Sequence, residues 1–152
     1  MNATKEKKAA DEALFLGEIY KNAKMGADSI INLLPHVKDD GLRSMMTLQL
    51  DGYEKYASRA AKALAERGVA AKEENIVTRL SARMGMAINT MIDSTKSHIA
   101  EMMIEGSNMG ITDMIKLLNE HEPRGTSKEA ARLAREVVVF EEHNLEMLKR
   151  FL

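Results

Sequence analysis

A carboxylate and an amide stand three residues apart near the end of the chain, inside a row of apolar residues. Glu141 and Asn144 share this row with Val137 and Leu148, because residues three and four apart lie on one side of a helix. Oxygen ligands that converge inside a protein can hold a metal ion such as manganese or iron. Glu141 and Asn144 are therefore candidate metal ligands.

Two further polar residues are expected to meet this pair in the middle of the molecule. Gln49 lies in the apolar row of an earlier predicted helix, and Glu105 lies at the edge of another. Counting residues outward from the connections places Glu105 level with Glu141, and it places Tyr53 in the same layer. The predicted metal site consists of Glu141, Glu105, Asn144 and Gln49. We predict no catalytic nucleophile and no cofactor pocket, since the sequence has neither a glycine-rich phosphate loop nor zinc-ligand spacing.

The elements that position these residues are predicted to be helices throughout, because apolar residues recur every three or four positions. Pro35 ends the first helix, since a residue before proline avoids helical geometry. Asp39 or Asp40 begins the second, and Gly68 follows its end. Thr126 has capping-box spacing with Glu129, which predicts the start of the last helix. The predicted core helices span residues 4–34, 40–67, 95–121 and 126–151.

The segment between the second and third core helices has two interpretations. Helical spacing continues without a break from Lys72 to His121, and a single helix of that length would be roughly 75 Å long. Such a helix would fit an interlocked dimer. Ser94 and Thr95 offer side-chain hydrogen bonds that compete with a helix. They favour the second interpretation, in which residues 69–94 form a partly helical crossover that returns the chain along the bundle.

The local sequence also resembles a known group of proteins. The segments SHIAEMMIEGSNMGITDMIKLL and VVVFEEHNLEMLKRFL, together with the helix spacing, resemble small bacterial ferritin-like proteins of unassigned function. The resemblance covers nearly the whole chain and implies one domain, residues 1–152. It implies an all-α four-helix bundle with a long crossover between helices 2 and 3. It also implies a place for two iron ions, held by a Glu on two helices and a Glu-x-x-His motif on the other two.

The chain departs from that ligand pattern at its central layer. Asn144 stands where the histidine after Glu141 is expected, and Gly52 stands three residues after Gln49. At best two carboxylates remain, so we expect a hydrogen-bonded polar layer and no resident cofactor. The expected function is that of a non-enzymatic bundle acting through protein or small-ligand contacts. The alternative is a divergent metal-binding or di-iron oxidoreductase-like protein, active in iron handling or peroxide reduction, with iron or manganese at the predicted site.

Composition narrows the classes of partner. The net charge is −1, from 22 basic and 23 acidic residues, so no broad field attracts nucleic acid. The absence of cysteine excludes disulfides and thiolate metal sites. No apolar run has the length of a membrane span, so we expect a cytoplasmic protein without membrane contact. Apolar residues on outward helix faces favour a homodimer or a helical protein partner: Leu14, Met25, Met86, Ile104 and Ile111.

Overall fold

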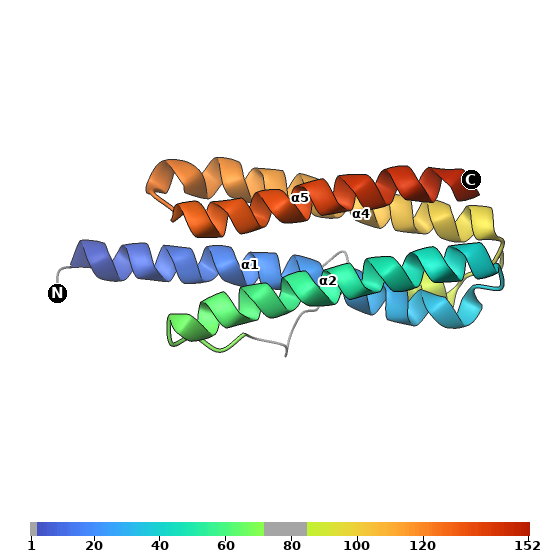
Figure 1. Ribbon diagram of the computed structural model, residues 1–152, viewed down its shortest axis with the longest axis horizontal. Helices are drawn as coiled ribbons and strands as arrows, with labels where there is room; N and C mark the ends of the chain where they lie inside the picture. The colour runs from blue at the N-terminus through green and yellow to red at the C-terminus, as the bar shows by residue number, and fades with distance from the viewer. Residues whose placement is uncertain (1–2, 72–84) are drawn as a thin grey trace.

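Four long helices make up most of the chain (Figure 1). The computed structural model describes residues 3–71 and 85–152, and these contain no strand. The all-helical prediction is therefore confirmed for this part of the chain. No helix within it has the length and apolar character that crossing a membrane requires. The long helices are α1 (Ala3–Leu33), α2 (Asp40–Glu66), α4 (Lys96–His121) and α5 (Lys128–Leu148), with short 3₁₀ turns at Leu34–His36, Glu122–Arg124 and Lys149–Phe151.

The long helices pack as two antiparallel pairs. α1 pairs with α2, α4 pairs with α5, and the pairs meet through α1 against α4 and α2 against α5 (Figure 1). One apolar core fills the space between them, because each helix turns one apolar face inward. Its largest fully buried side chains include Phe15 of α1, Leu42 of α2, Ile99 of α4 and Leu148 of α5.

The end of α1 and both ends of α2 lie where the sequence predicts them. α1 stops at Leu33, and the turn that follows contains Pro35. The Asp39 side chain caps α2 by accepting a hydrogen bond from the Leu42 amide at 2.8 Å. Gly68 follows α2 with a φ of 73°, a left-handed conformation that glycine adopts without steric cost. These three boundary predictions are confirmed.

The segment before α4 rules out one uninterrupted helix from residue 72 to residue 121. Residues 91–95 are not helical, and the Thr95 side chain caps α4 by accepting from the His98 amide at 3.3 Å. A hydroxyl that caps the next helix stabilises a break at this point. Residues 85–89 are helical, as expected of a partly helical crossover. The crossover residues 72–84 lie outside the described part of the chain.

The start of α5 differs from the prediction by one residue. Ser127, not Thr126, caps the helix, and its hydroxyl accepts from the Ala130 amide at 3.2 Å. The Thr126 hydroxyl instead donates to the carbonyl of His121 at 2.9 Å. Both residues can cap a helix, so their side chains alone did not decide between them. Gly125, with a φ of 90°, ends the preceding turn in the left-handed conformation.

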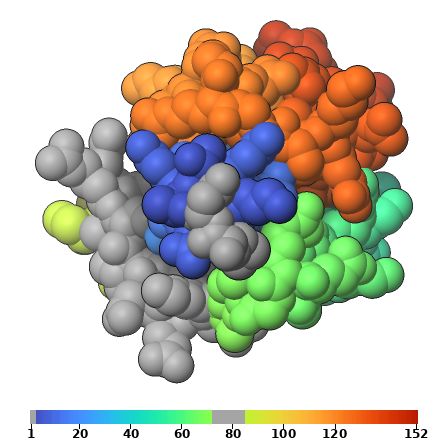
Figure 2. Space-filling model, turned by 90° about the vertical axis from the view of Figure 1, so that its left-hand side faces the viewer, coloured from blue at the N-terminus to red at the C-terminus, as the bar shows by residue number. Residues whose placement is uncertain are grey.

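A carboxylate of α1 joins three elements at one end of the bundle. Glu12 Oε2 accepts from Arg67 Nε at 2.9 Å, and its Oε1 accepts from the Ser127 amide at 2.9 Å. Burial alone would raise the pKa of Glu12, but the hydrogen bonds from Ser127 and Arg67 bring it below its ordinary value. Figure 2 shows this end of the molecule, where α1 lies between the α4–α5 connection and the end of α2.

Candidate functional site

A layer of polar side chains crosses the middle of the bundle and receives residues from all four helices. Polar groups in a helical core need hydrogen-bond partners, since water is not there to supply them. Each member of the layer is almost completely buried. The members are Asn22 of α1, Gln49 and Tyr53 of α2, Ser107 of α4, and Glu141 and Asn144 of α5.

Glu141 is the carboxylate of this layer and is only 1% exposed. Asn22 Nδ2 donates a hydrogen bond to its Oε1. A Cβ atom at Gly110 would lie 2.1 Å from its Oε2, so a larger residue at that position of α4 would force the Glu141 side chain to move. Burial raises the pKa of Glu141 to about 8; the Asn22 hydrogen bond opposes this rise, and the charge of Asp113 adds to it. The carboxyl group therefore holds a proton at neutral pH.

Tyr53 links α2 to the two opposite helices. Burial raises the pKa of Tyr53 above the ordinary range and the Glu141 charge adds to the rise, while the neighbouring Ser107 and Asn144 side chains oppose it. Its ring lies 4.9 Å from the ring of Phe140, edge to face. Gly26 leaves room for the ring, because a Cβ there would lie 2.4 Å from Tyr53 Cε1. Tyr53 is therefore held neutral and fixed in place.

Two amides complete the layer beside Tyr53. Gln49 Nε2 donates to the backbone carbonyl of Asn144 at 3.4 Å, a long hydrogen bond. Asn144 Nδ2 is buried and has no hydrogen-bond partner among the described residues. A buried donor without an acceptor is costly. The layer is therefore not saturated by the protein groups that form it.

A cavity of about 40 Å³ adjoins the layer. Its polar lining comes from Asn22, Gln49, Tyr53, Ser107 and Glu141, and Ser29 adds a further hydroxyl. A water molecule needs roughly 10–15 Å³ of such space, so the cavity has room for about three water-sized occupants. The polar layer thus borders a small, partly open cavity with room for a few water-sized groups.

The structure brings together three of the four predicted metal ligands. Gln49, Asn144 and Glu141 lie in the layer, and Tyr53 joins them as expected. Glu105 does not, because it is exposed on α4, and its prediction as a core ligand is corrected. The reason is the rotation of α4 about its axis. The buried face of α4 runs through Met103, Ser107, Gly110 and Met114, which leaves Glu105 on the outward side of the helix.

Sequence reasoning missed Asn22 and Ser107. α1 has no carboxylate centred on its apolar row at this height, and its polar contribution to the layer is the buried amide of Asn22. Asn22 lies four residues before Gly26, so the two share one face of α1. A polar side chain next to a residue without a side chain is the sequence pattern that could have indicated Asn22. Ser107 is found only if the rotation of α4 is known.

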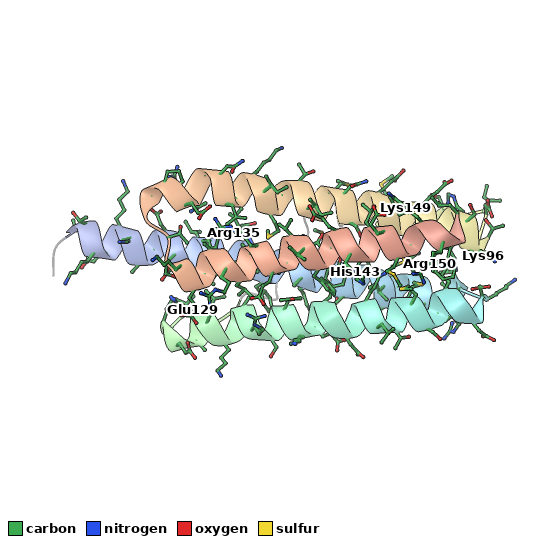
Figure 3. All side chains as sticks on the ribbon, turned by 45° about the horizontal axis from the view of Figure 1, so that its top comes forward. Lys96, Glu129, Arg135, His143, Lys149 and Arg150 are labelled. Atoms are coloured by element: carbon green, nitrogen blue, oxygen red, sulfur yellow. The ribbon has the colours of Figure 1, made fainter. Side chains whose placement is uncertain are left out.

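The histidines lie away from Glu141. His143 is exposed on α5 (Figure 3). His98 is partly exposed near Glu101, with 3.9 Å between Nδ1 and Oε2. His121 is buried against the ring of Phe15, with 5.6 Å between ring centroids. Within residues 3–71 and 85–152, no three His, Cys, Asp or Glu side chains are placed to share a metal ion.

Fold and site together define a class: an all-helical bundle with a buried polar layer at its centre. No family model matches the chain, and no curated protein matches it. Among solved structures, the chain is similar to the conserved hypothetical protein rv2844 from Mycobacterium tuberculosis, with a TM-score of 0.64 and 14% sequence identity over the whole of both chains. At this identity the similarity concerns the fold alone.

Proposed function

We propose that the protein is a non-enzymatic, ferritin-like helical bundle that acts through contacts with a protein or a small ligand. The observation that carries the proposal is the state of Glu141. It is the one carboxylate in the described polar layer, and an amide of α1 donates to it. A neutral, hydrogen-bonded carboxyl group suits a structural or ligand-binding layer, because it needs no metal ion to balance its charge.

The topology supports the ferritin-like part of the proposal. α1 and α2 form one antiparallel pair, α4 and α5 form the other, and α2 and α4 begin at the same end of the bundle (Figure 1). The connection from α2 to α4 must therefore travel the length of the bundle. A single long crossover between two such pairs is the connectivity of ferritin-like bundles.

The layer does not fit the two iron ions that enzymes of this fold hold. Such a centre uses carboxylates from all four helices and two imidazoles. The described layer offers one carboxyl group, three amides and two hydroxyls: Glu141, then Asn22, Gln49 and Asn144, then Tyr53 and Ser107. One carboxylate cannot balance two buried divalent ions, and uncompensated buried charge is strongly unfavourable.

Metal loading tests this proposal against its alternative, a divergent iron- or manganese-binding oxidoreductase. The protein is exposed anaerobically to iron(II) or manganese(II), desalted and analysed for metal. We expect close to zero metal per chain, both in the wild type and in Glu141→Gln. One or two metal ions per chain, lost in Glu141→Gln, would support the alternative and call for assays of oxygen and peroxide consumption.

We further propose that the chain is a cytoplasmic homodimer. Leu14 on α1 is 62% exposed and Met86 is 68% exposed, and large apolar side chains on a surface are typical of contact sites. Leu14 borders two hollows, one shared with Leu64 of α2 and one shared with Leu117 of α4. The outer face of α1 around Leu14 is therefore our candidate for the dimer contact.

A further inference from the structure

We propose that two copies of this chain dimerise through antiparallel contact of their α1 helices, with Lys7 of each copy against the partner's Glu18. The inference rests on the homodimer of the proposed function and deepens it, because it names how the two copies are arranged and which charges select that arrangement.

Lys7, Leu14 and Glu18 lie along one line on the outer face of α1. A helix turns by roughly 100° per residue, so the three side chains leave its axis within about 40° of one another. All three residues are exposed, and Leu14 is 62% exposed. A positive and a negative side chain therefore flank an exposed leucine, one on each side of it along the helix.

A hollow between α1 and α4 borders this line and carries an excess of negative charge. Leu14, Met114 and Leu117 supply its apolar lining. Arg124 Nη2 lies 3.5 Å from Glu120 Oε1, so these two charges balance each other. The remaining charged side chains of the lining are three carboxylates against one lysine amine: Asp11, Glu18 and Asp113 against Lys116.

The start of α1 carries the opposite charge. Residues 3–8 contain three lysines and one glutamate, and all six residues are exposed. The first turns of α1 project beyond the connection between α4 and α5 (Figure 1). A projecting, positively charged helix end is complementary to the acidic hollow of a second copy.

This complementarity cannot be satisfied within one chain. Lys7 and Glu18 are eleven residues apart on the same helix, which separates them by roughly 16 Å along its axis. An ion pair needs its nitrogen and oxygen within about 4 Å. The pair between Lys7 and Glu18 can therefore form only between two copies.

A twofold axis lets both copies form the pair at once. Where Lys7 lies level with the partner's Glu18, the symmetry also places Glu18 level with the partner's Lys7. The two Leu14 residues are then roughly 4.5 Å apart along the helix axis and meet near the twofold axis. Placing the two Leu14 residues directly level would instead oppose Lys7 to the partner's Lys21, and like charges disfavour that register.

Glu18 has the capacity for a second amine. Lys21 Nζ lies 3.4 Å from Glu18 Oε1, and the Glu18 side chain is 50% exposed in this pair. An ionised carboxylate accepts several hydrogen bonds through its two oxygens. The partner's Lys7 can therefore bind Glu18 without displacing Lys21.

Charge reversal tests the arrangement with the full chain. In Lys7→Glu both symmetric contacts oppose two carboxylates, and in Glu18→Lys both oppose two amines. Each variant alone should raise the Kd of the dimer by at least about tenfold at low ionic strength. An equimolar mixture of the two variants has opposite charges at both contacts and should restore the Kd of the wild type. Sedimentation equilibrium measures all four samples.

An exposed ion pair at the end of α5 provides the matched control. Glu146 and Lys149 have the same spacing as Glu18 and Lys21, with 2.7 Å between Oε1 and Nζ, and they are exposed. Glu146→Lys and Lys149→Glu should each leave the Kd of the dimer unchanged, because the end of α5 is outside the proposed contact.

Engineered cysteines test the register, since the chain has no cysteine of its own. Lys7→Cys mixed with Glu18→Cys should give a disulfide-linked pair under mild oxidation. Neither variant alone should do so, because two identical positions lie roughly 16 Å apart along the helix axis. Non-reducing gel electrophoresis distinguishes these results.

Two results would overturn the α1 arrangement and leave the homodimer in place. One is a dimeric wild type whose Kd is unchanged by both charge reversals. The other is a mixture of the two reversed variants that stays monomeric, or a cysteine mixture that forms no disulfide. A wild type that is monomeric at all concentrations would remove the proposed homodimer together with its arrangement.

Discussion

At the scale of single residues, Glu141 couples the protonation of a carboxyl group to the stability of the bundle. In the unfolded chain its pKa is near 4.5, and in the folded chain burial raises it to about 8. Between these values the folded chain keeps a proton that the unfolded chain has released. The free energy of unfolding must therefore fall as the pH rises through this range.

The first prediction follows for Glu141→Gln. The stabilising contribution of the protonated carboxyl is complete below pH 4.5 and is lost by pH 8, a change of at most roughly 5 kcal/mol. The substitution should remove this part of the pH dependence and stabilise the protein at pH 8. Urea unfolding between pH 5 and pH 9 in choline chloride measures the effect. Glu142→Gln is the control, and an unchanged slope in Glu141→Gln would contradict the assignment.

The second prediction concerns the glycine opposite Glu141. A methyl group at Gly110 would lie 2.1 Å from Glu141 Oε2, whereas one at Gly17 of α1 would meet nothing within 4 Å. Gly110→Ala should lower the free energy of unfolding by about 1–3 kcal/mol. Gly17→Ala should raise it by about 0.5–1 kcal/mol, because alanine is the better helix former. Equal effects of the two substitutions in urea unfolding would show that Gly110 is not tightly packed.

At the scale of the elements, Glu12 holds α1 to the end of α2 and to the start of α5. Its side chain is 20% exposed and that of Arg67 is 27% exposed, so this ion pair is screened less than a surface pair. Glu12→Ala should cost about 1–3 kcal/mol of stability. Because the pKa of Glu12 is lowered in the fold, its contribution is present at neutral pH and disappears in acid.

Glu18→Ala serves as the control for Glu12, because Glu18 forms a pair with Lys21 in which its side chain is 50% exposed. Exposed pairs of this kind contribute at most about 1 kcal/mol. Thermal unfolding at pH 7 and pH 3 compares the two variants. A difference between Glu12→Ala and wild type that is as large at pH 3 as at pH 7 would count against the charge-assisted role of Glu12.

The sequence predicts elements better than it predicts contacts between them. Pro35, Asp39 and Gly68 act locally, so the boundaries they set could be read from the chain itself. The position of Glu105 could not, because α4 has two neighbouring apolar rows and only packing against α1 and α5 selects the buried one. In contrast, Glu141 and Asn144 lie in a single clear row, and their burial was predicted.

At the scale of the whole molecule, the proposed dimer makes a prediction about a single surface residue. Leu14→Lys places a charge in the candidate contact and should convert the dimer into a monomer. Leu48 of α2 is 69% exposed and lies outside that contact, so Leu48→Lys should leave the dimer intact. Sedimentation equilibrium distinguishes these results, and a wild type that is monomeric at all concentrations would refute the proposal.

The two ends of the chain lie at opposite ends of the bundle (Figure 1). Tension applied between them therefore acts along the helix axes. α1 and α5 must then slide past their neighbours as whole helices, so many side-chain contacts have to fail together. In a helical hairpin whose two chain ends lie side by side, the same tension would separate the two helices one turn at a time. The bundle is consequently built to resist stretching between its termini, a mechanical property that follows from its connectivity alone.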